Sequence, residues 1–318
     1  MAFAPDRYTL VADTGGTNTR VALADGTRLL PDTVTRFANA DYPGLQAVLE
    51  AFIAKQDGVD CAAAAVAVAG PVMDGKAELT NLDWTIDEDT VARATRAERV
   101  AVLNDLAAQG HAMGHIAEDM LRRVIEGPEK AGGAKLVIGV GTGFNIAAVH
   151  EGPKGRIVPP AEAGHVTLPV RNEADLRLAE HLKEIHGFAS VEDVLSGRGL
   201  ERLYAWTCDQ AGAPHAASAS EIIGALEDGD ARAEAAARAF ARLLGTVAGD
   251  QALINLPYGG IYLIGGVARA LTPWLAEFGF TEAFRDKGRF AGLMESFSVT
   301  TVEDDYAALH GLARHMAS

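Results

Sequence analysis

The residues of this sequence that could do chemistry begin with an aspartate at the end of an apolar run. Asp105 follows "RVAVLN", which predicts a buried strand that ends at Asn104 and a helix that begins near Asp105. The sheets of α/β proteins usually hold their ligands at the carboxyl ends of the strands. A carboxylate placed there can accept the proton of an alcohol during phosphoryl transfer. The alternative on position alone is an aspartate that only caps its helix.

A second group of polar residues follows later in the chain. Glu162 and His165 lie three residues apart in "PPAEAGHVTLP", and both can share protons with the vicinal hydroxyls of a polyhydroxylated ligand. No Cys or His with zinc spacing lies nearby, although a buried histidine with a structural role is an alternative. Glu192 in "ASVEDVLSGRGL" is predicted just inside a helix, where stabilisation of the helix dipole is the simpler interpretation.

Two glycine-rich loops have the composition of phosphate-binding turns. Gly15-Gly16-Thr17-Asn18 and Gly141-Thr142-Gly143 each lie between two apolar runs, and a third pair, Gly265-Gly266, follows "IYLI". Without Cβ atoms the backbone N–H groups of such turns can converge on an anion, and adenine could lie against Gly265-Gly266. Asp13, just before the first loop, could orient Mg²⁺ through water, since this ion keeps several of its waters. For either loop alone, a simple hairpin turn is the alternative.

Other phosphate-binding motifs are absent from the sequence. There is no G-x-x-x-x-G-K-[ST] loop and no H-R-D catalytic loop of a protein kinase. The segment "GVGTGFN" lacks the third glycine of a dinucleotide fingerprint, and the β-like "NIAAVH" follows it where that motif requires a helix. A Rossmann site is therefore disfavoured.

The elements that must position these residues follow an α/β pattern. Strands are predicted at 8–14, 19–25, 62–70 and 99–105, with helices between the later ones. Residues 134–152 repeat the first arrangement of apolar run, glycine loop and apolar run, which indicates an internally duplicated fold unless the likeness is due to chance. Residues 172–255 are predicted to be mostly helical, and a last helix is predicted after residue 304.

Composition narrows the class of partners. The 318 residues include 43 acidic and 28 basic ones, for a net charge of −15, which disfavours binding to nucleic acid or to an anionic membrane surface. The N-terminus lacks the pattern of a signal peptide, and the longest small-apolar run falls short of the ~20 residues of a membrane span. Two cysteines form neither a disulfide framework nor a metal knuckle. We expect a cytoplasmic protein.

Taken together, the motifs resemble those of the bacterial-type glucokinase family, within the hexokinase/actin/Hsp70-like ATPase fold. The matching segments are "DTGGTN", "LTNLDW", "LNDLAA", "GVGTG", "AEAGHV", "SVEDVLSGRGL", "LIGG" and "AFRDKGRF", in order from residue 13 to residue 290. The resemblance implies an α/β protein with a duplicated actin-like ATPase (ribonuclease H-like) fold, two lobes around a central cleft. It implies a small lobe of residues 1–106 plus 304–318 and a large lobe of residues 107–303.

The resemblance also implies an activity and a role for each candidate residue. The activity is ATP-dependent phosphorylation of D-glucose at its 6-hydroxyl to glucose 6-phosphate, the first step of glucose catabolism. Asp105 would be the catalytic base; the sugar would be bound by Asn81, Asn104, Asp105, Glu162, His165 and Glu192; ATP would be bound by Asp13, Gly15, Gly16, Thr17, Asn18, Gly141, Thr142, Gly143, Gly265 and Gly266. Asp13 would orient Mg²⁺, and the partners would be glucose and Mg-ATP. The family is cytoplasmic and typically dimeric, and it closes its lobes over the sugar.

Two residues depart from the family pattern, and two alternative functions stay open. One is His310 in "DDYAALHGLARH", where a leucine-glycine pair is commoner and for which we expect a structural role. Asn145 stands where the family usually has a glycine, so that its side chain could crowd the nucleotide. The same residues would serve another hexose kinase that takes mannose, fructose or an N-acetylhexosamine. A non-catalytic, sugar-responsive regulator could also have kept the fold, although such a protein has no need of Asp105. The cysteine-rich zinc motif of the related repressor/open-reading-frame/kinase sugar kinases is absent.

Overall fold

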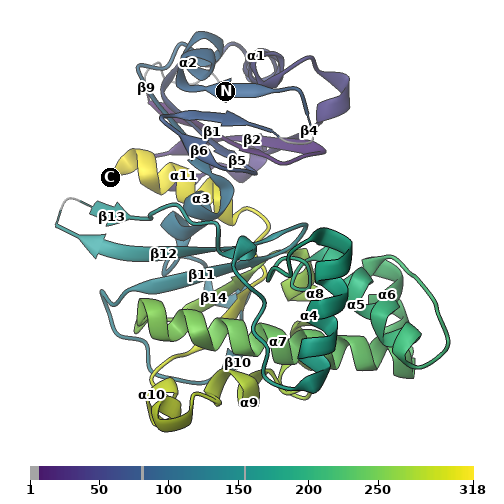
Figure 1. Cartoon of the computed structure of the whole chain (residues 1–318). Coiled ribbons are helices and arrows are strands. Elements are labelled where there is room, and N and C mark those ends of the chain that lie inside the picture. The colour runs from purple at the N-terminus through teal and green to yellow at the C-terminus, as the bar shows by residue number, and fades with distance from the viewer. Residues whose placement is uncertain (1–6, 80–81, 154) are drawn as a thin grey trace. The chain divides into compact units, whose positions relative to one another are not determined.

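The apolar runs on either side of the two glycine loops form strands of two separate sheets, as a computed structural model shows (Figure 1). The structure describes residues 7–79, 82–153 and 155–318. The chain divides into two compact units. The first comprises Met1–Ile116, Gly152–Pro160 and Asp304–Ser318; the second comprises Ala117–Glu151 and Ala161–Glu303.

The first unit is built on a sheet in the order β3-β2-β1-β5-β9, with β4 paired to β2. Its strands are β1 (Tyr8–Thr14), β2 (Asn18–Asp25), β3 (Arg28–Leu29), β4 (Thr35–Ala38), β5 (Cys61–Val68) and β9 (Arg99–Asn104). β1 and β2 form an antiparallel hairpin around the first glycine loop, whereas β1, β5 and β9 run parallel. The predicted strands 8–14, 19–25, 62–70 and 99–105 are therefore confirmed to within one or two residues.

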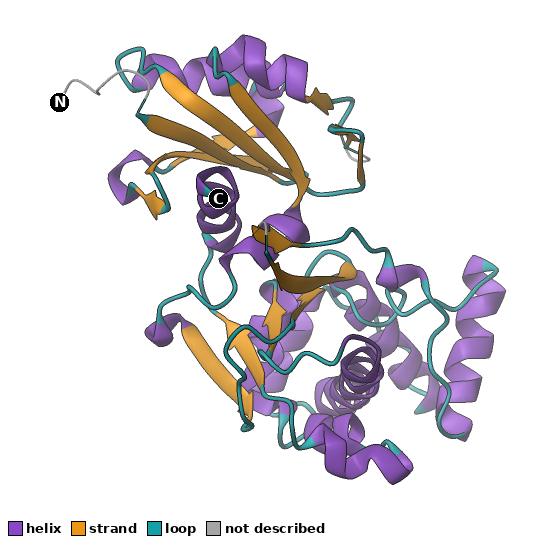
Figure 2. Cartoon of the chain, turned by 90° about the vertical axis from the view of Figure 1, so that its left-hand side faces the viewer, coloured by secondary structure: helices purple, strands orange, loops and turns teal. Residues whose placement is uncertain are grey.

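Helices cover both faces of this sheet (Figure 2). They are α1 (Leu45–Lys55), α2 (Glu88–Thr95), α3 (Asp105–Ala112) and α11 (Ala307–Ala317). Large side chains such as Phe52 fill the core under α1 and α2, while small residues of β5, including Ala65, meet α11 on the other face. A three-stranded sheet of β6 (Val72–Met73), β7 (Lys76–Glu78) and β8 (Thr85–Asp87) completes this part of the chain.

The second sheet repeats the topology of the first, in the order β10-β15-β14-β11-β12-β13. Its strands are β10 (Leu121–Ile125), β11 (Lys135–Val140), β12 (Phe144–Gly152), β13 (Gly155–Ile157), β14 (Ile261–Ile264) and β15 (Val299–Val302). β11 and β12 form the hairpin around the second glycine loop, and β11, β14 and β15 run parallel. The hairpin and its parallel neighbours thus occur twice, which confirms the predicted duplication.

The remaining helices belong to the second unit. They are α4 (Glu173–His186), α5 (Gly197–Gln210), α6 (Ala219–Glu227), α7 (Ala231–Asn255), α8 (Gly266–Leu275), α9 (Phe280–Arg285) and α10 (Ala291–Met294). Those within residues 172–255 confirm that this stretch is mostly helical. The buried, alanine-rich α7 packs between α5 and α9 in the largest core cluster, and α4 stops at Gly187 in left-handed conformation (φ 77°).

Helix α3 is held on two sides within the first unit. An added Cβ at Gly311 of α11 would lie 1.7 Å from the carbonyl oxygen of Ala108, so the two helix backbones are in direct contact there. At the other end, Nη1 of Arg156 donates to the carbonyl oxygens of Gly110, His111 and Met113 at 3.1, 2.7 and 2.8 Å. A cation at this end also complements the helix dipole. The predicted boundary at residue 106 falls inside this helix.

The α3–α11 contact includes the side chains of two histidines, one from each helix. The rings of His111 and His315 meet edge to face with their centroids 4.6 Å apart, and burial lowers the pKa of His315 below its ordinary 6.5. The unfolded chain therefore takes up a proton at this residue at a higher pH than the folded chain. We expect the free energy of unfolding to fall as the pH drops below about 6.5, and this slope to be shallower in His315→Gln.

Urea denaturation of both proteins at a series of pH values measures this difference. His150, which is exposed on β12, offers the control substitution His150→Gln, which removes a histidine away from the α3–α11 contact. Parallel pH profiles for wild type and His315→Gln would contradict the expectation.

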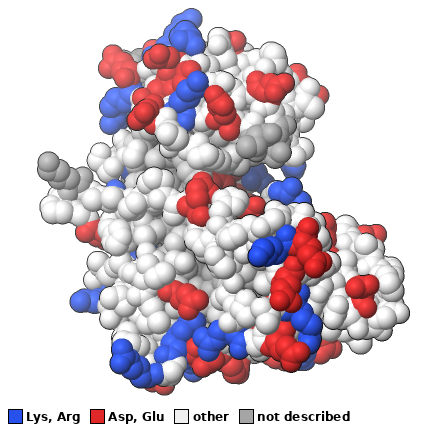
Figure 3. All heavy atoms as spheres, viewed as in Figure 1, with Lys and Arg blue, Asp and Glu red and all other residues white. Residues whose placement is uncertain are grey.

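Acidic side chains appear over both units on the face drawn in Figure 3, with Lys and Arg interspersed among them. Among the described residues, no helix is both long and apolar enough to cross a membrane.

Candidate active site

The first glycine loop is a tight turn fixed by a buried asparagine. The N–H of Gly15 donates to the carbonyl of Asn18 at 3.0 Å, which closes the turn between β1 and β2. Asn39, only 2% exposed, donates its amide to the Gly15 carbonyl at 2.8 Å and its backbone N–H to Thr17 at 2.9 Å. Asn39 was not predicted from the sequence, because "RFANADY" carries no motif and its partners lie more than 20 residues away.

Asp13 is the second-last residue of β1, beside this loop. Burial raises the pKa of its carboxyl above the ordinary value of 3.8, and Arg20, whose Nη1 is 3.7 Å from Oδ2 on the neighbouring strand, opposes that rise. Among the described residues, no group of three or more His, Cys, Asp or Glu side chains could hold a metal ion.

Asn104 and Asp105 lie where β9 ends and α3 begins, as predicted. Asn104 is the N-cap: its Oδ1 accepts from the N–H groups of Leu106 at 3.0 Å and Ala107 at 3.3 Å, and its amide donates to Gly70. Asp105 is the first residue of the helix, half-buried, with Oδ1 accepting from the N–H of Leu106 at 2.8 Å. The N-cap of this helix is therefore Asn104 and not Asp105.

The second glycine loop lies against the start of helix α8. A Cβ on Gly141 would lie 4.0 Å from the Cα of Gly265, and one on Gly265 would lie 2.4 Å from the carbonyl of Val140. Gly265 (φ 110°) is the N-cap of α8 and provides no side-chain cap, so the first N–H groups of this helix are left to another acceptor. Glycine loop and helix terminus together have the donors that bind phosphate groups. These residues fit a nucleotide.

Glu162, His165 and Glu192 come together beside the second glycine loop. The backbone N–H of Glu192 donates to the carbonyl of Gly164, which lies between Glu162 and His165, at 2.9 Å. Oε2 of Glu192 accepts from the N–H of Phe144 at 2.8 Å. Glu162 and His165 are exposed, and within the described chain neither side chain has a hydrogen-bond or ion-pair partner. Their polar atoms are thus available to a ligand with hydroxyl groups.

The prediction that Glu192 lies just inside a helix is wrong. It lies in a turn before α5, which begins only at Gly197, after Ser196 caps the helix through the N–H of Gly199. The turn forms because the hydroxyl and N–H of Ser190 both donate to Asp193. Glu192 therefore does not serve a helix dipole but joins two loops.

The structure divides the predicted residues between the two units. Asp13, Gly15, Gly16, Thr17, Asn18, Asn104 and Asp105 are in the first unit; Gly141, Thr142, Gly143, Glu162, His165, Glu192, Gly265 and Gly266 are in the second. Asn81 lies outside the described residues.

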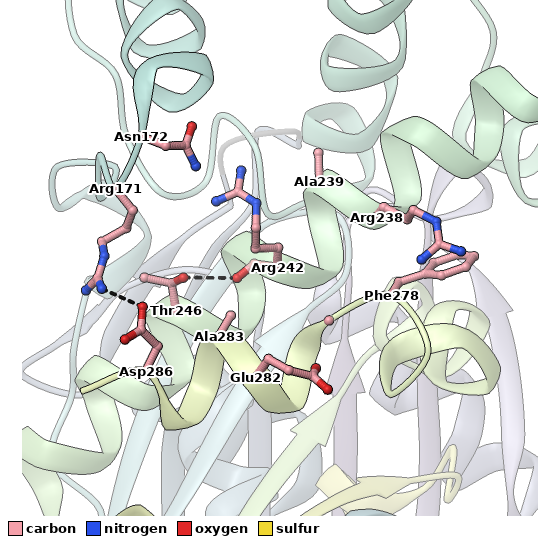
Figure 4. A pocket seen from close by; sticks show the side chains of 11 residues that line it. Arg171, Asn172, Arg238, Ala239, Arg242, Thr246, Phe278, Glu282, Ala283 and Asp286 are labelled. Atoms are coloured by element: carbon pink, nitrogen blue, oxygen red, sulfur yellow. Dashed lines mark hydrogen bonds and ion pairs between the residues drawn. The ribbon is translucent and has the colours of Figure 1, made fainter. Parts of the chain in front are cut away.

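A cavity of about 730 Å³ in the second unit lies between the start of α4, α7 and α9, and none of the predicted site residues lines it (Figure 4). Three arginines face it, and each is paired. Arg171 binds Asp286, Arg242 binds the buried Asp175, and Arg238 binds Glu234 and lies over the ring of Phe278.

Comparison with known proteins places this arrangement in a family. A family model described as Glucokinase matches residues 10–318. A glucokinase from Rhizobium leguminosarum bv. trifolii is 32% identical over 308 residues, which cover 96% of this chain and 90% of that protein.

Solved structures give the same result. The glucokinase of an Antarctic psychrotroph superposes with a TM-score of 0.86 at 28% identity, covering 97% of this chain and 98% of that one. A ROK family glucokinase from Streptomyces griseus, solved in complex with glucose and AMPPNP, shares the fold with a TM-score of 0.64 at 22% identity, covering 96% and 98% of the two chains. The fold is that of the actin-like ATPases, as predicted. Since the model and the relative both span nearly the whole sequence, this chain belongs to the glucokinase family.

Proposed function

We propose that this protein transfers the γ-phosphoryl group of ATP to the 6-hydroxyl of D-glucose. The bond between the sugar oxygen and phosphorus forms while the bond from phosphorus to the ADP oxygen breaks. The hydroxyl proton passes to the carboxylate of Asp105. An aspartate is a weak base toward an alcohol, so this transfer occurs as the phosphorus–oxygen bond forms and not before it.

The observation that carries the proposal is the double attachment of Glu192. One of its carboxylate oxygens holds the backbone at Phe144, directly after the second glycine loop, while its own N–H holds the loop that presents Glu162 and His165. A nucleotide loop and a set of side chains suited to sugar hydroxyls are thus fixed to one residue. This arrangement supports a kinase whose acceptor is a polyol.

The nucleotide would be held by backbone groups. The N–H groups of the first loop, the second loop and the start of α8 would bind the phosphates, and the adenosine would lie at Gly265-Gly266. Mg²⁺, when bound, would neutralise charge on the phosphates, with Asp13 orienting it through water. Asn104, Glu162, His165 and Glu192 would bind the sugar, together with Asn81.

The two compact units would act as the two lobes of the enzyme. The first would supply Asp105 and the first phosphate loop, and the second would supply the second phosphate loop and the sugar loop. We further propose a homodimer located in the cytoplasm. The two cysteines of the chain, Cys61 and Cys208, are free and buried, which is compatible with a reducing compartment.

The test is ADP release from ATP with Mg²⁺ over a panel of glucose, mannose, fructose and N-acetylglucosamine. We expect kcat/KM for glucose to exceed that for the other three sugars. A pocket that hydrogen-bonds hydroxyl groups discriminates strongly, because a missing partner leaves a buried polar group unpaired.

Each other result has a defined meaning. Preference for another sugar in the panel would keep the phosphoryl transfer and replace the substrate. No turnover with any sugar by a folded protein that binds nucleotide would overturn the proposal in favour of a sugar-responsive regulator.

A further inference from the structure

Asn145, the second residue of β12, makes three side-chain hydrogen bonds to backbone groups. Its Nδ2 donates to the carbonyl oxygen of Ala161 at 2.5 Å. Its Oδ1 accepts from the N–H of Ala163 at 2.9 Å and from that of Ile146 at 2.8 Å. One amide therefore ties the start of β12 to the loop that presents Glu162.

The two bonds to that loop flank Glu162 on either side. Ala161 precedes it and Ala163 follows it, so the peptide groups on both sides of Glu162 are fixed by the same side chain. Glu162 has a non-helical backbone (φ −130°, ψ 54°), and its carboxylate does not cap the short 3₁₀ helix Ala163–His165 that follows. Asn145 thus sets the backbone of a residue whose carboxylate is exposed.

The position on the strand explains why a side chain can reach the loop. Phe144 and Ile146 are 3% and 8% exposed and point into the core, so the alternation of the strand turns Asn145 to the opposite face. The contact needs a donor and an acceptor on one short side chain. Glycine has neither, and aspartate keeps only the acceptor.

We propose that Asn145 is a positioning residue for the sugar, which orients Glu162 toward a substrate hydroxyl. This inference rests on the proposed function and deepens it. The sequence alone suggested that Asn145 crowds the nucleotide, whereas its amide is committed to the loop of Glu162. The specificity of sugar binding in this chain then depends on a residue that does not touch the sugar.

The experiment compares the Michaelis constants of both substrates in the full-length protein. In Asn145→Ala and Asn145→Gly, we expect KM for glucose to rise about tenfold, the equivalent of one or two lost hydrogen bonds, with KM for ATP nearly unchanged. Asn145→Asp keeps the acceptor for Ala163 but places a carboxylate oxygen against the carbonyl oxygen of Ala161, so KM for glucose should rise at least as much as in Asn145→Ala. Asn255 also donates its amide to a backbone carbonyl, at the end of α7, and Asn255→Ala is the matched control with unchanged constants.

Several outcomes would overturn the inference. A fall in KM for ATP in Asn145→Gly with KM for glucose unchanged would assign the residue to the nucleotide. An equal loss of kcat in Asn145→Ala and Asn145→Asp, with both Michaelis constants intact and a lower melting temperature, would make its role purely structural. A wild-type protein without turnover on any sugar would instead overturn the proposed function, and this inference with it.

Discussion

Asp105→Asn is expected to lower kcat for sugar phosphorylation by about 10²–10⁴-fold, the contribution typical of a positioned general base. The substitution preserves the shape of the side chain and an acceptor oxygen for the N–H of Leu106, which Asp105 now binds at 2.8 Å. The N-cap of α3 is Asn104 and stays in place. The loss should therefore appear in kcat, with little change in KM for glucose or in stability.

A second Asp-to-Asn substitution at the start of a helix provides the control. Asp230 caps α7 through the N–H groups of Arg232 and Ala233, far along the chain from the proposed site, and asparagine caps a helix about as well. Asp230→Asn should keep full activity. Initial rates and urea denaturation curves for the three proteins separate catalysis from folding. If Asp105→Asn kept most of the wild-type kcat, Asp105 would not be the base.

Gly311→Ala is expected to have the largest effect on stability. The added methyl would lie 1.7 Å from the carbonyl oxygen of Ala108 and 3.1 Å from the N–H nitrogen of Ala112, and both are backbone atoms that cannot rotate away. Overpacking of this kind costs about 1–3 kcal/mol, and more where backbone must move. Because Asp105 is the first residue of the displaced helix, kcat should fall as well.

The same substitution at another helical glycine is expected to stabilise the protein instead of destabilising it. Gly224 of α6 has nothing within 4 Å of the Cβ position. Gly224→Ala should therefore raise the free energy of unfolding by about 0.5–1 kcal/mol, because alanine loses less backbone entropy in a helix. Urea midpoints measure both changes. Equal urea midpoints for wild type and Gly311→Ala would contradict the expected loss of stability, because α3 and α11 would then accommodate the added methyl group without a change in the free energy of unfolding.

Local patterns in the sequence were enough to predict most of the elements. The apolar run 8–14 is the strand β1, and the alanine-rich stretch that starts at Ala231 is the helix α7. Gly187 ends α4 because glycine adopts the left-handed conformation of a helix terminus readily and needs no distant partner for it. The repeated hairpin also predicted the duplicated topology.

Contacts between distant segments could not be predicted in the same way. Nothing near Gly311 in the sequence shows that α3, two hundred residues earlier, lies against it. Asn39 holds the first glycine loop from a segment with no motif, and Asn145 binds a loop that begins 16 residues later. Glu192 lies four residues before the N-cap Ser196 of α5, and the turn that holds it depends on the hydrogen bonds between Ser190 and Asp193.

The packing of α11 has a consequence for how the protein is made on the ribosome. One face of the first sheet consists of small apolar residues such as Val11 and Ala65, and its cover, including Leu309 and Leu312, comes from the last helix of the chain. At typical rates of synthesis of about 5–20 residues per second, α11 is synthesised on the order of ten seconds or more after the strands of this face. The first-made unit is therefore completed only after α11 has been synthesised, and this face of its alanine-rich strands is uncovered until then.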